Sequence, residues 1–105
     1  MMDMQEMDMQ KIEAKADTVA GFLKGLANPR RLLILCQLSE GEKSVSELIE
    51  ATGIAQTSMS QHLSKLKAEG MVDFRRDHRT LYYFIDEPAV EKIMLTLYDR
   101  FCGTM

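Results

Sequence analysis

Two cysteines, Cys36 and Cys102, are the most reactive side chains that this sequence offers. A thiolate is a nucleophile, a metal ligand and a target of oxidation. Cys36 lies in the apolar run 32–38, and Cys102 follows Phe101 near the end of the chain. Taken separately, they are explained as a small core residue and a tail residue without a role. If the last helix packs on the helix that carries Cys36, the two thiols meet, and a functional dithiol is then equally consistent with the sequence.

No other group of residues predicts catalysis or metal binding. A thiol oxidoreductase normally carries a Cys-x-x-Cys pair at a helix N-terminus, and this sequence has none. His62 and His78 have no evident catalytic partner, and with two distant cysteines they do not make a convincing tetrahedral zinc set. We therefore expect no enzymatic activity, no cofactor and no resident metal.

Residues 54–70 point to recognition rather than to catalysis. Met59, Leu63 and Leu66 recur at i, i+4 and i+7, which predicts a helix with one buried stripe. The other face carries short hydrogen-bonding groups and a cation, which suit base edges and phosphates when a helix lies in the major groove. A polar helix that only faces water is the alternative. The predicted DNA-binding residues of this helix are Gln56, Thr57, Ser58, Ser60, Gln61, His62 and Lys65.

The segment before this helix predicts a helix-turn-helix. Ser44 and Glu47 have the spacing of a capping box, in which each side chain bonds the backbone N–H of the other residue. Gly53 suits the left-handed residue that follows a helix. Two helices joined by a tight, glycine-containing turn, the second with a polar outer face, form the helix-turn-helix arrangement.

The segment after it predicts a wing. Residues 71–76 and 80–85 are rich in β-branched and aromatic side chains and flank the polar turn 77–79. A hairpin directly after a recognition helix is the wing of a winged helix, and its cations are placed to meet DNA phosphates. The predicted contacts from the wing are Arg75, Arg76 and Arg79.

Three further helices complete the expected order of elements. Apolar residues spaced by four and three from Ile12 to Leu26 predict a helix with a narrow seam, for packing on the body or on a partner subunit. Asn28 and Pro29 predict the start of a second helix, which ends near residues 39–41 and has almost no polar side, so it should be central and buried. Its first turn carries two cations that could serve either a phosphate or a neighbouring carboxylate, Arg30 and Arg31.

The last helix should begin at residues 86–88 and present an apolar stripe. That stripe contains Val90, Ile93, Met94, Leu97 and Phe101, with Tyr98 beside it. On so small a domain, such a helix either completes the core or joins the first helix in a dimer interface. We expect the dimer, because one winged helix contacts only one half-site.

Length and charge set the bounds. A chain of 105 residues with 46% hydrophobic residues predicts one domain. We expect a flexible segment at 1–10, rich in Met, and at 11–105 a mainly α winged helix-turn-helix domain with a small β-hairpin. The chain is acidic, with 13 Lys and Arg against 16 Asp and Glu, whereas residues 54–85 hold five against three. A local basic face on an acidic protein is compatible with DNA binding.

The absence of a signal-peptide pattern and of about 18 consecutive apolar residues predicts a cytoplasmic protein without a membrane partner.

Several runs of the sequence together resemble the ArsR family of bacterial winged-helix repressors. The resemblance extends from about Val19 onward, and its motifs occur in the family's order: residues 26–36, 44–48, 56–63 and 70–72, followed by the Arg-containing hairpin. It implies a homodimeric transcriptional repressor whose partner is double-stranded operator DNA. Residues 34–36 and 97–102 resemble the dithiol branch of the family. That resemblance implies that Cys36 and Cys102 react with persulfide, polysulfide or related reactive sulfur species, after which the DNA is released.

Other responses remain open alternatives. Metal-sensing branches carry Cys-x-Cys before the recognition helix, where this chain has Ser44, Val45 and Ser46. From Asp86 onward the chain has no histidine, unlike branches that bind metal on the last helix. A metal- or metalloid-responsive repressor, a general thiol-redox regulator and a winged helix that binds only protein are thus the competing hypotheses.

Overall fold

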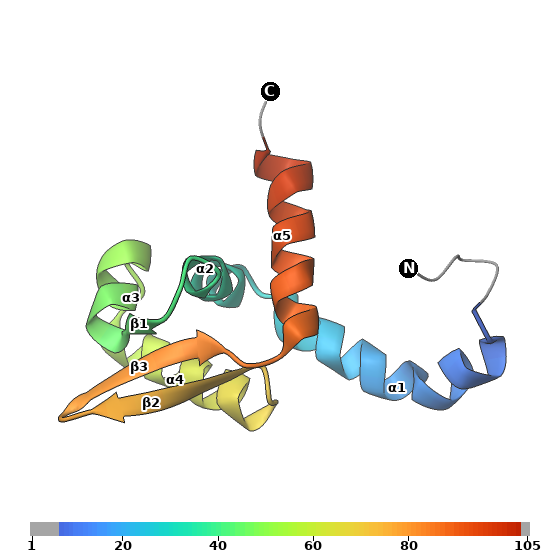
Figure 1. The fold of residues 1–105 in the computed structure, drawn as a ribbon, viewed down its shortest axis with the longest axis horizontal. Helices are drawn as coiled ribbons and strands as arrows, with labels where there is room; N and C mark the ends of the chain where they lie inside the picture. Colours follow the sequence, from blue (N-terminus) through green and yellow to red (C-terminus); the bar gives the residue numbers. More distant parts are fainter. Residues whose placement is uncertain (1–6, 104–105) are drawn as a thin grey trace.

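The computed structural model describes residues 7–103. Most of the segment expected to be flexible, residues 1–10, therefore lies outside the described residues. The elements follow the order expected for a winged helix, with one added strand (Figure 1). They are α1 (Met9–Leu26), α2 (Pro29–Leu38), β1 (Lys43–Ser44), α3 (Val45–Thr52), α4 (Gln56–Ala68), β2 (Val72–Asp77), β3 (Thr80–Ile85) and α5 (Pro88–Cys102).

Local capping residues account for most helix starts. The Asp8 side chain accepts from the N–H of Gln10, so α1 begins at Met9, inside the segment expected to precede it. The Asn28 side chain accepts from two backbone N–H groups of α2, and Pro29 occupies its first turn. In α5, the Glu87 side chain accepts from the N–H of Ala89. These ends follow from short-range chemistry that the sequence displays.

The expectation that α2 is buried on all sides is wrong. Ile34 and Leu35 are fully buried, but 51% of Leu33 is exposed and Cys36 is also exposed. The helix contacts α1, α3, α5 and β3, and these neighbours leave Leu33 and Cys36 uncovered. Its apolar composition therefore does not correspond to complete burial.

The sheet has one strand more than expected. Its order is β1-β3-β2, and both pairings are antiparallel. In the hairpin, Val72 is opposite Ile85 and Asp77 is opposite Thr80, as a tight wing requires. His78 in the connecting turn has a φ of 58°. The added β1 is only two residues long and leads directly into α3, so it is too short to show an alternating pattern in the sequence.

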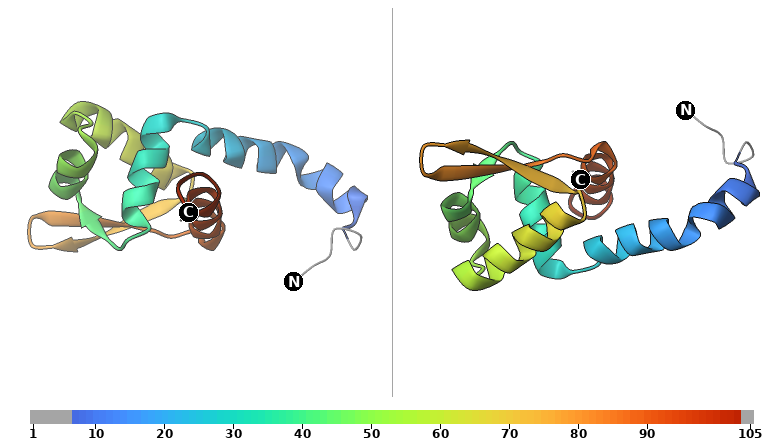
Figure 2. Two further views of the ribbon diagram at one scale, coloured as in Figure 1. Left: turned by 90° about the horizontal axis from the view of Figure 1, so that it is seen from above. Right: turned by 90° about the horizontal axis from the view of Figure 1, so that it is seen from below.

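The core lies where α2, α3, α4 and the hairpin meet. It is formed by Leu26, Ile34, Leu35, Leu38, Leu48, Ile54, Met59, Leu63, Leu66, Met71, Val72, Tyr83, Val90 and Met94. Both α1 and α5 project from this body in different directions (Figures 1 and 2). No helix among residues 7–103 is long and apolar enough to cross a membrane.

Much of the apolar surface of the two projecting helices has no cover within the protomer. On α1 the predicted seam is left open, with 43% of Ile12, 47% of Val19 and 50% of Leu23 exposed. The first half of the α5 stripe is buried, but 71% of Phe101 and 60% of Tyr98 are exposed. The seam of α1 therefore does not pack on the body along most of its length.

Candidate nucleic-acid interface and thiol pocket

Helix α4 has the two faces that its sequence predicts. Met59, Leu63 and Leu66 are buried and attach the helix to the core. Ala55 provides no side-chain cap, so the first turn of α4 lacks a side-chain hydrogen bond to its N–H groups. Ser58 is half-buried. The other predicted residues of the outer face are exposed: Gln56, Thr57, Ser60, Gln61 and Lys65.

His62 lies on the flank of α4 rather than at the centre of its outer face. The residue is half-buried, and this burial lowers the pKa of His62 below its ordinary value. Nearby positive charges lower that pKa further, namely those of Arg31, Arg30 and Lys65. Besides burial, the lowered pKa of His62 therefore reflects a positive electrostatic potential between α4 and the start of α2.

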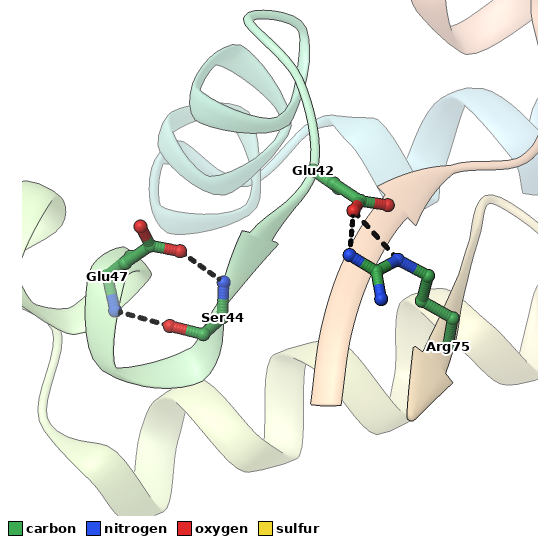
Figure 3. Close-up of polar contacts among 4 residues, drawn as sticks. All are labelled: Glu42, Ser44, Glu47 and Arg75. Atoms are coloured by element: carbon green, nitrogen blue, oxygen red, sulfur yellow. Dashed lines mark hydrogen bonds and ion pairs between the residues drawn. The ribbon is translucent and has the colours of Figure 1, made fainter. Parts of the chain in front are cut away.

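The three wing arginines are not equivalent. Arg76 and Arg79 are exposed near the tip of the hairpin. Arg75 instead donates through Nε to Glu42 Oε1 at 2.8 Å and makes a second, Nη2 contact with the same oxygen. Its guanidinium also lies 4.7 Å from the centre of the Tyr82 ring. Arg75 is thus engaged within the protein (Figure 3).

The carboxylate that holds Arg75 precedes the capping box of α3. Ser44 Oγ accepts from the N–H of Glu47 at 3.1 Å, while the Glu47 carboxylate accepts from the N–H of Ser44 at 2.8 Å (Figure 3). These hydrogen bonds, the Ser44 N–H first, lower the pKa of Glu47. The box fixes the start of α3, and Gly53, with a φ of 75°, ends it in the left-handed conformation. This is the helix-turn-helix that the sequence predicts.

The start of α2 shows which protein groups contact Arg31. Arg31 is buried, donates through Nη1 to the carbonyl oxygen of Gly25 at 3.1 Å, and lies 3.6 Å from Glu69 Oε1. Of the two partners that the sequence left open for Arg31, the neighbouring carboxylate is the one present. The backbone of Gly25 lies close to this pair, since a Cβ at this position would lie 2.6 Å from the Glu69 oxygen and the Glu69 side chain would have to shift.

The two cysteines line the same pocket. It is a cavity of about 400 Å³ between the end of α2 and the last turns of α5. Both cysteines are exposed free thiols. Partial burial raises the pKa of Cys36, and the neighbouring Cys102 and Glu40 charges raise it further. The pocket is lined by Cys36, Gln37, Ser39, Glu40, Met94, Leu95, Tyr98 and Cys102.

The predicted site residues therefore fall into two separate groups in the structure. One group faces outward from α4 and the wing tip, and the other group is the thiol pair. Three carboxylates that were not among the predicted site residues contact or influence one of them: Glu40, Glu42 and Glu69. No group of three or more His, Cys, Asp or Glu side chains suited to a metal ion occurs within residues 7–103.

Comparison with known proteins identifies the family. Residues 28–73 match the family described as bacterial regulatory protein, arsR family. The nodulation protein NolR of Rhizobium meliloti is 46% identical over 91% of this chain and 78% of its own length. This chain belongs to the ArsR family of bacterial regulatory proteins. The family expected from the sequence motifs is thus confirmed.

Solved structures of other regulators agree with this assignment. The transcriptional repressor BigR from Xylella fastidiosa is 38% identical, with a TM-score of 0.84 over 93% of this chain and 100% of BigR. A homodimeric winged helix-turn-helix DNA-binding domain from Mycobacterium bovis is 37% identical, with a TM-score of 0.73 over 90% of this chain and 86% of that domain. The winged helix-turn-helix fold is confirmed, and this ArsR-family chain is a transcriptional regulator rather than an enzyme.

Proposed function

We propose that this ArsR-family regulator is a repressor that binds operator DNA as a homodimer in the bacterial cytoplasm. The observation that carries the proposal is the exposed row of short polar side chains on α4, held outward by a fully buried opposite face. Such a row is suited to base edges in the major groove. The description of the related BigR as a transcriptional repressor supports the direction of the effect.

The apolar surfaces of α1 and α5 supply the dimer interface in this proposal. Large side chains such as Val19 and Leu23 on α1, and Tyr98 and Phe101 on α5, are about half exposed or more in the protomer. Covering them with a second copy removes this apolar area from water. A two-fold axis then presents two α4 helices to successive major grooves about 34 Å apart, so the operator is an imperfect inverted repeat.

The contacts divide into two kinds. Gln56, Ser58, Ser60 and Gln61 read bases or contact sugar and phosphate, and Thr57 and His62 lie beside them. Lys65, Arg76 and Arg79 meet phosphates, whereas Arg75 is held by Glu42. Footprinting tests this arrangement. Two protected half-sites one helical turn apart support the dimeric repressor, and a single unrepeated half-site contradicts it.

Salt titration separates a DNA-binding protein from a winged helix that binds only protein. The affinity for operator DNA should fall steeply as salt rises, with a slope of about −0.9 for each phosphate neutralised. A protein-binding module would show weak DNA binding with no sequence preference at any salt concentration.

We further propose that Cys36 and Cys102 form the regulatory dithiol and that persulfide releases the operator. The supporting observation is that both thiols, far apart in the sequence, line one pocket between α2 and α5. Because the pKa of Cys36 is raised, a smaller fraction of it is thiolate near neutral pH. Cys102 is therefore the attacking thiol in this mechanism.

The chemistry balances without any other oxidant. The Cys102 thiolate takes the outer sulfur of glutathione persulfide, which leaves a protein persulfide and releases glutathione thiolate. Cys36 is converted in the same way by a second persulfide molecule. The Cys36 persulfide anion then attacks the inner sulfur of the Cys102 persulfide and expels hydrosulfide, which gives a trisulfide. A bridge with an inserted sulfur spans a longer gap than a disulfide, whose Cα atoms must lie within about 4.4–6.8 Å.

A covalent link between α2 and α5 has a direct consequence for DNA binding. It pulls the last turns of α5 toward the end of α2, and α5 is part of the proposed dimer interface. Two recognition helices must fit both grooves at once, so a small change in the angle between protomers reduces affinity.

Treatment of the reduced protein with glutathione persulfide tests this mechanism. We expect operator release together with a link between the Cys36 and Cys102 peptides that is one sulfur atom heavier than a disulfide. The variants Cys36→Ser and Cys102→Ser should keep their operator under the same treatment. A serine variant that still releases DNA contradicts the dithiol mechanism. If peroxide forms a plain disulfide and releases the operator equally well, the protein is a general thiol-redox regulator. Release by zinc or arsenite favours metal or metalloid sensing.

A further inference from the structure

A second cavity, on the side of α4 away from the wing, is lined mainly by polar and positively charged groups. It has a volume of about 310 Å³ and lies between the end of α1, the start of α2 and the C-terminal half of α4. Figure 2 shows α1 leaving the body beside these two helices. Three cations line it, Lys24, Arg31 and Lys65, against one carboxylate, Glu69. The net charge of the cavity wall is therefore positive.

Arg31 leaves a donor unused in this wall. The side chain is nine-tenths buried, and its Nη1 already serves the Gly25 carbonyl oxygen and Glu69. Its Nε is buried without a hydrogen-bond partner among the described residues. A buried, unpaired donor on a charged group is costly, unless a ligand supplies the missing acceptor. Because Nε itself has almost no accessible surface, an anion in the cavity would offset the charge of Arg31 rather than accept from this donor.

The electrostatic potential beside the cavity, as indicated by the pKa of His62, agrees with the net positive charge of the cavity wall. His62 lies next to this corner of α4, and its pKa is lowered by burial and then by Arg31, Arg30 and Lys65. Positive charge that disfavours a protonated imidazole favours an anion at the same place. The pKa of His62 thus reflects, after burial, the same Arg31 and Lys65 charges that line the cavity, and it agrees with an anion site there.

The position of the cavity relative to α4 suggests the source of the anion. Lys65 lines this cavity and also a hollow on the outer face, together with Ser60, Gln61 and Ser64. Lys67, two residues further, points about 200° away around the helix. There it lies 3.7 Å from Asp73 of β2 and 5.4 Å from the Phe74 ring centre. The wing therefore lies along one flank of α4, and the cavity along the other.

We propose that this cavity receives a backbone phosphate of the operator. The proposal rests on the function above, in which α4 lies in the major groove. A major groove about 12 Å wide is bordered by two phosphate backbones, one on each side of an inserted helix. The wing cations meet one backbone, and Lys24 and Lys65 meet a phosphate of the other, with the positive charge of the buried Arg31 behind them. Lys24 is the new DNA-contact residue, although it belongs to α1, outside the helix-turn-helix.

Charge variants on the cavity wall test the proposal. Lys24→Gln should weaken operator binding roughly tenfold at moderate salt and reduce the salt slope by about 1.8, since a homodimer carries two such cavities. Glu69→Gln should act in the opposite direction and tighten binding, because it removes the carboxylate that repels phosphate. Lys92→Gln, on the exposed surface of α5, is the matched control and should leave the slope unchanged. Fluorescence anisotropy with a labelled operator measures all three.

A neutral phosphate identifies the contact on the DNA. A series of operators with single methylphosphonates beside each half-site should contain one position that weakens wild-type binding but does not weaken Lys24→Gln further. If wild type binds its operator and Lys24→Gln behaves like Lys92→Gln at every position, the cavity is not a phosphate site, although the proposed function stands. If inorganic phosphate shifts the Gly25 amide resonance while Lys24→Gln keeps full operator affinity, the cavity binds a free anion and the proposal is overturned. If wild type binds no operator at all, both proposals fail.

Discussion

At the scale of single residues, the environment of Cys36 decides how the thiol pair reacts. The side chain is exposed at the pocket, yet partial burial and the charges of Cys102 and Glu40 raise its pKa. Near neutral pH it is therefore more fully protonated than an ordinary cysteine, and only the thiolate is nucleophilic. In the proposed mechanism, Cys36 is therefore not the first thiol to attack.

The role of Glu40 gives a first prediction. Glu40→Gln removes one of the negative charges that raise the pKa of Cys36, so Cys36 should be alkylated faster at a fixed, mildly alkaline pH. Iodoacetamide labelling of the Cys102→Ser background, followed by peptide mass spectrometry, measures the rate. Glu50→Gln, an exposed carboxylate on α3, is the control and should not change it. An unchanged rate in Glu40→Gln would mean that burial alone sets the pKa.

The wing arginines give a second prediction at the same scale. Arg76→Ala and Arg79→Ala should each reduce the salt slope of operator binding by about 1.8 per homodimer, because in the proposed complex each exposed arginine meets one phosphate per protomer. Arg75→Ala should change this slope much less, since Glu42 and Tyr82 already engage its guanidinium. Salt titrations of the three variants measure the difference. Equal slope changes for all three would show that Arg75 leaves Glu42 when DNA binds.

At the scale of elements, the capping box of α3 holds the helix-turn-helix in register. Ser44→Ala should reduce the free energy of unfolding by about 1 kcal/mol, since it removes the acceptor for the Glu47 N–H. Urea unfolding measures the loss. Ser46→Ala, exposed on the same helix, should have a much smaller effect.

The same box makes stability depend on pH. The pKa of Glu47 is lowered in the folded state, so its contribution is present above the ordinary glutamate pKa and is lost as the pH falls through the folded-state value. Glu47→Gln should therefore unfold with a flatter pH dependence in mildly acidic solution, which urea titrations at several pH values would show. An identical pH profile would assign acid sensitivity to other carboxylates.

Helix α1 contains a matched pair of glycines. A Cβ at Gly25 would lie 2.6 Å from Glu69 Oε1 and 2.9 Å from Met71 Cε, whereas nothing lies within 4 Å of a Cβ at Gly21. Gly25→Ala should gain less stability than Gly21→Ala, because the ends of the Glu69 and Met71 side chains must move to make room. Gly21→Ala should raise it by up to about 1 kcal/mol through helix propensity. Thermal unfolding of both variants measures the contrast, and equal stabilisation of the two variants would contradict the close contact at Gly25.

At the scale of the whole molecule, the exposed apolar surfaces of α1 and α5 indicate that a single protomer does not cover its own apolar side chains. Phe101→Asp should shift the proposed homodimer toward monomer and weaken operator binding, because it places a charge in the proposed interface. Sedimentation velocity measures the shift, and the wild-type melting temperature should rise with protein concentration. Ala51→Asp, exposed on α3 away from both helices, is the control. A Phe101→Asp protein that remains dimeric would place the interface elsewhere.

The sequence by itself determined the features that depend on neighbours three or four residues apart. The buried stripe of α4 follows from the spacing of Met59, Leu63 and Leu66, and the start of α3 follows from Ser44 and Glu47. Such features rest on helical periodicity and on local hydrogen bonds, and both can be recognised from residue type and spacing alone. The winged-helix order of elements was predictable for the same reason.

Only the tertiary structure decided which charged groups are free and which are already paired. Arg75 and Glu42 are 33 residues apart, and the bond between them exists because β1 joins the edge of the wing. Arg31 meets Glu69 only because α1, α2 and α4 converge at Gly25. The exposure of Cys36 likewise depends on which face of α2 its neighbours cover. Contacts between residues distant in sequence are set by the packing of whole elements, and local periodicity carries no information about them.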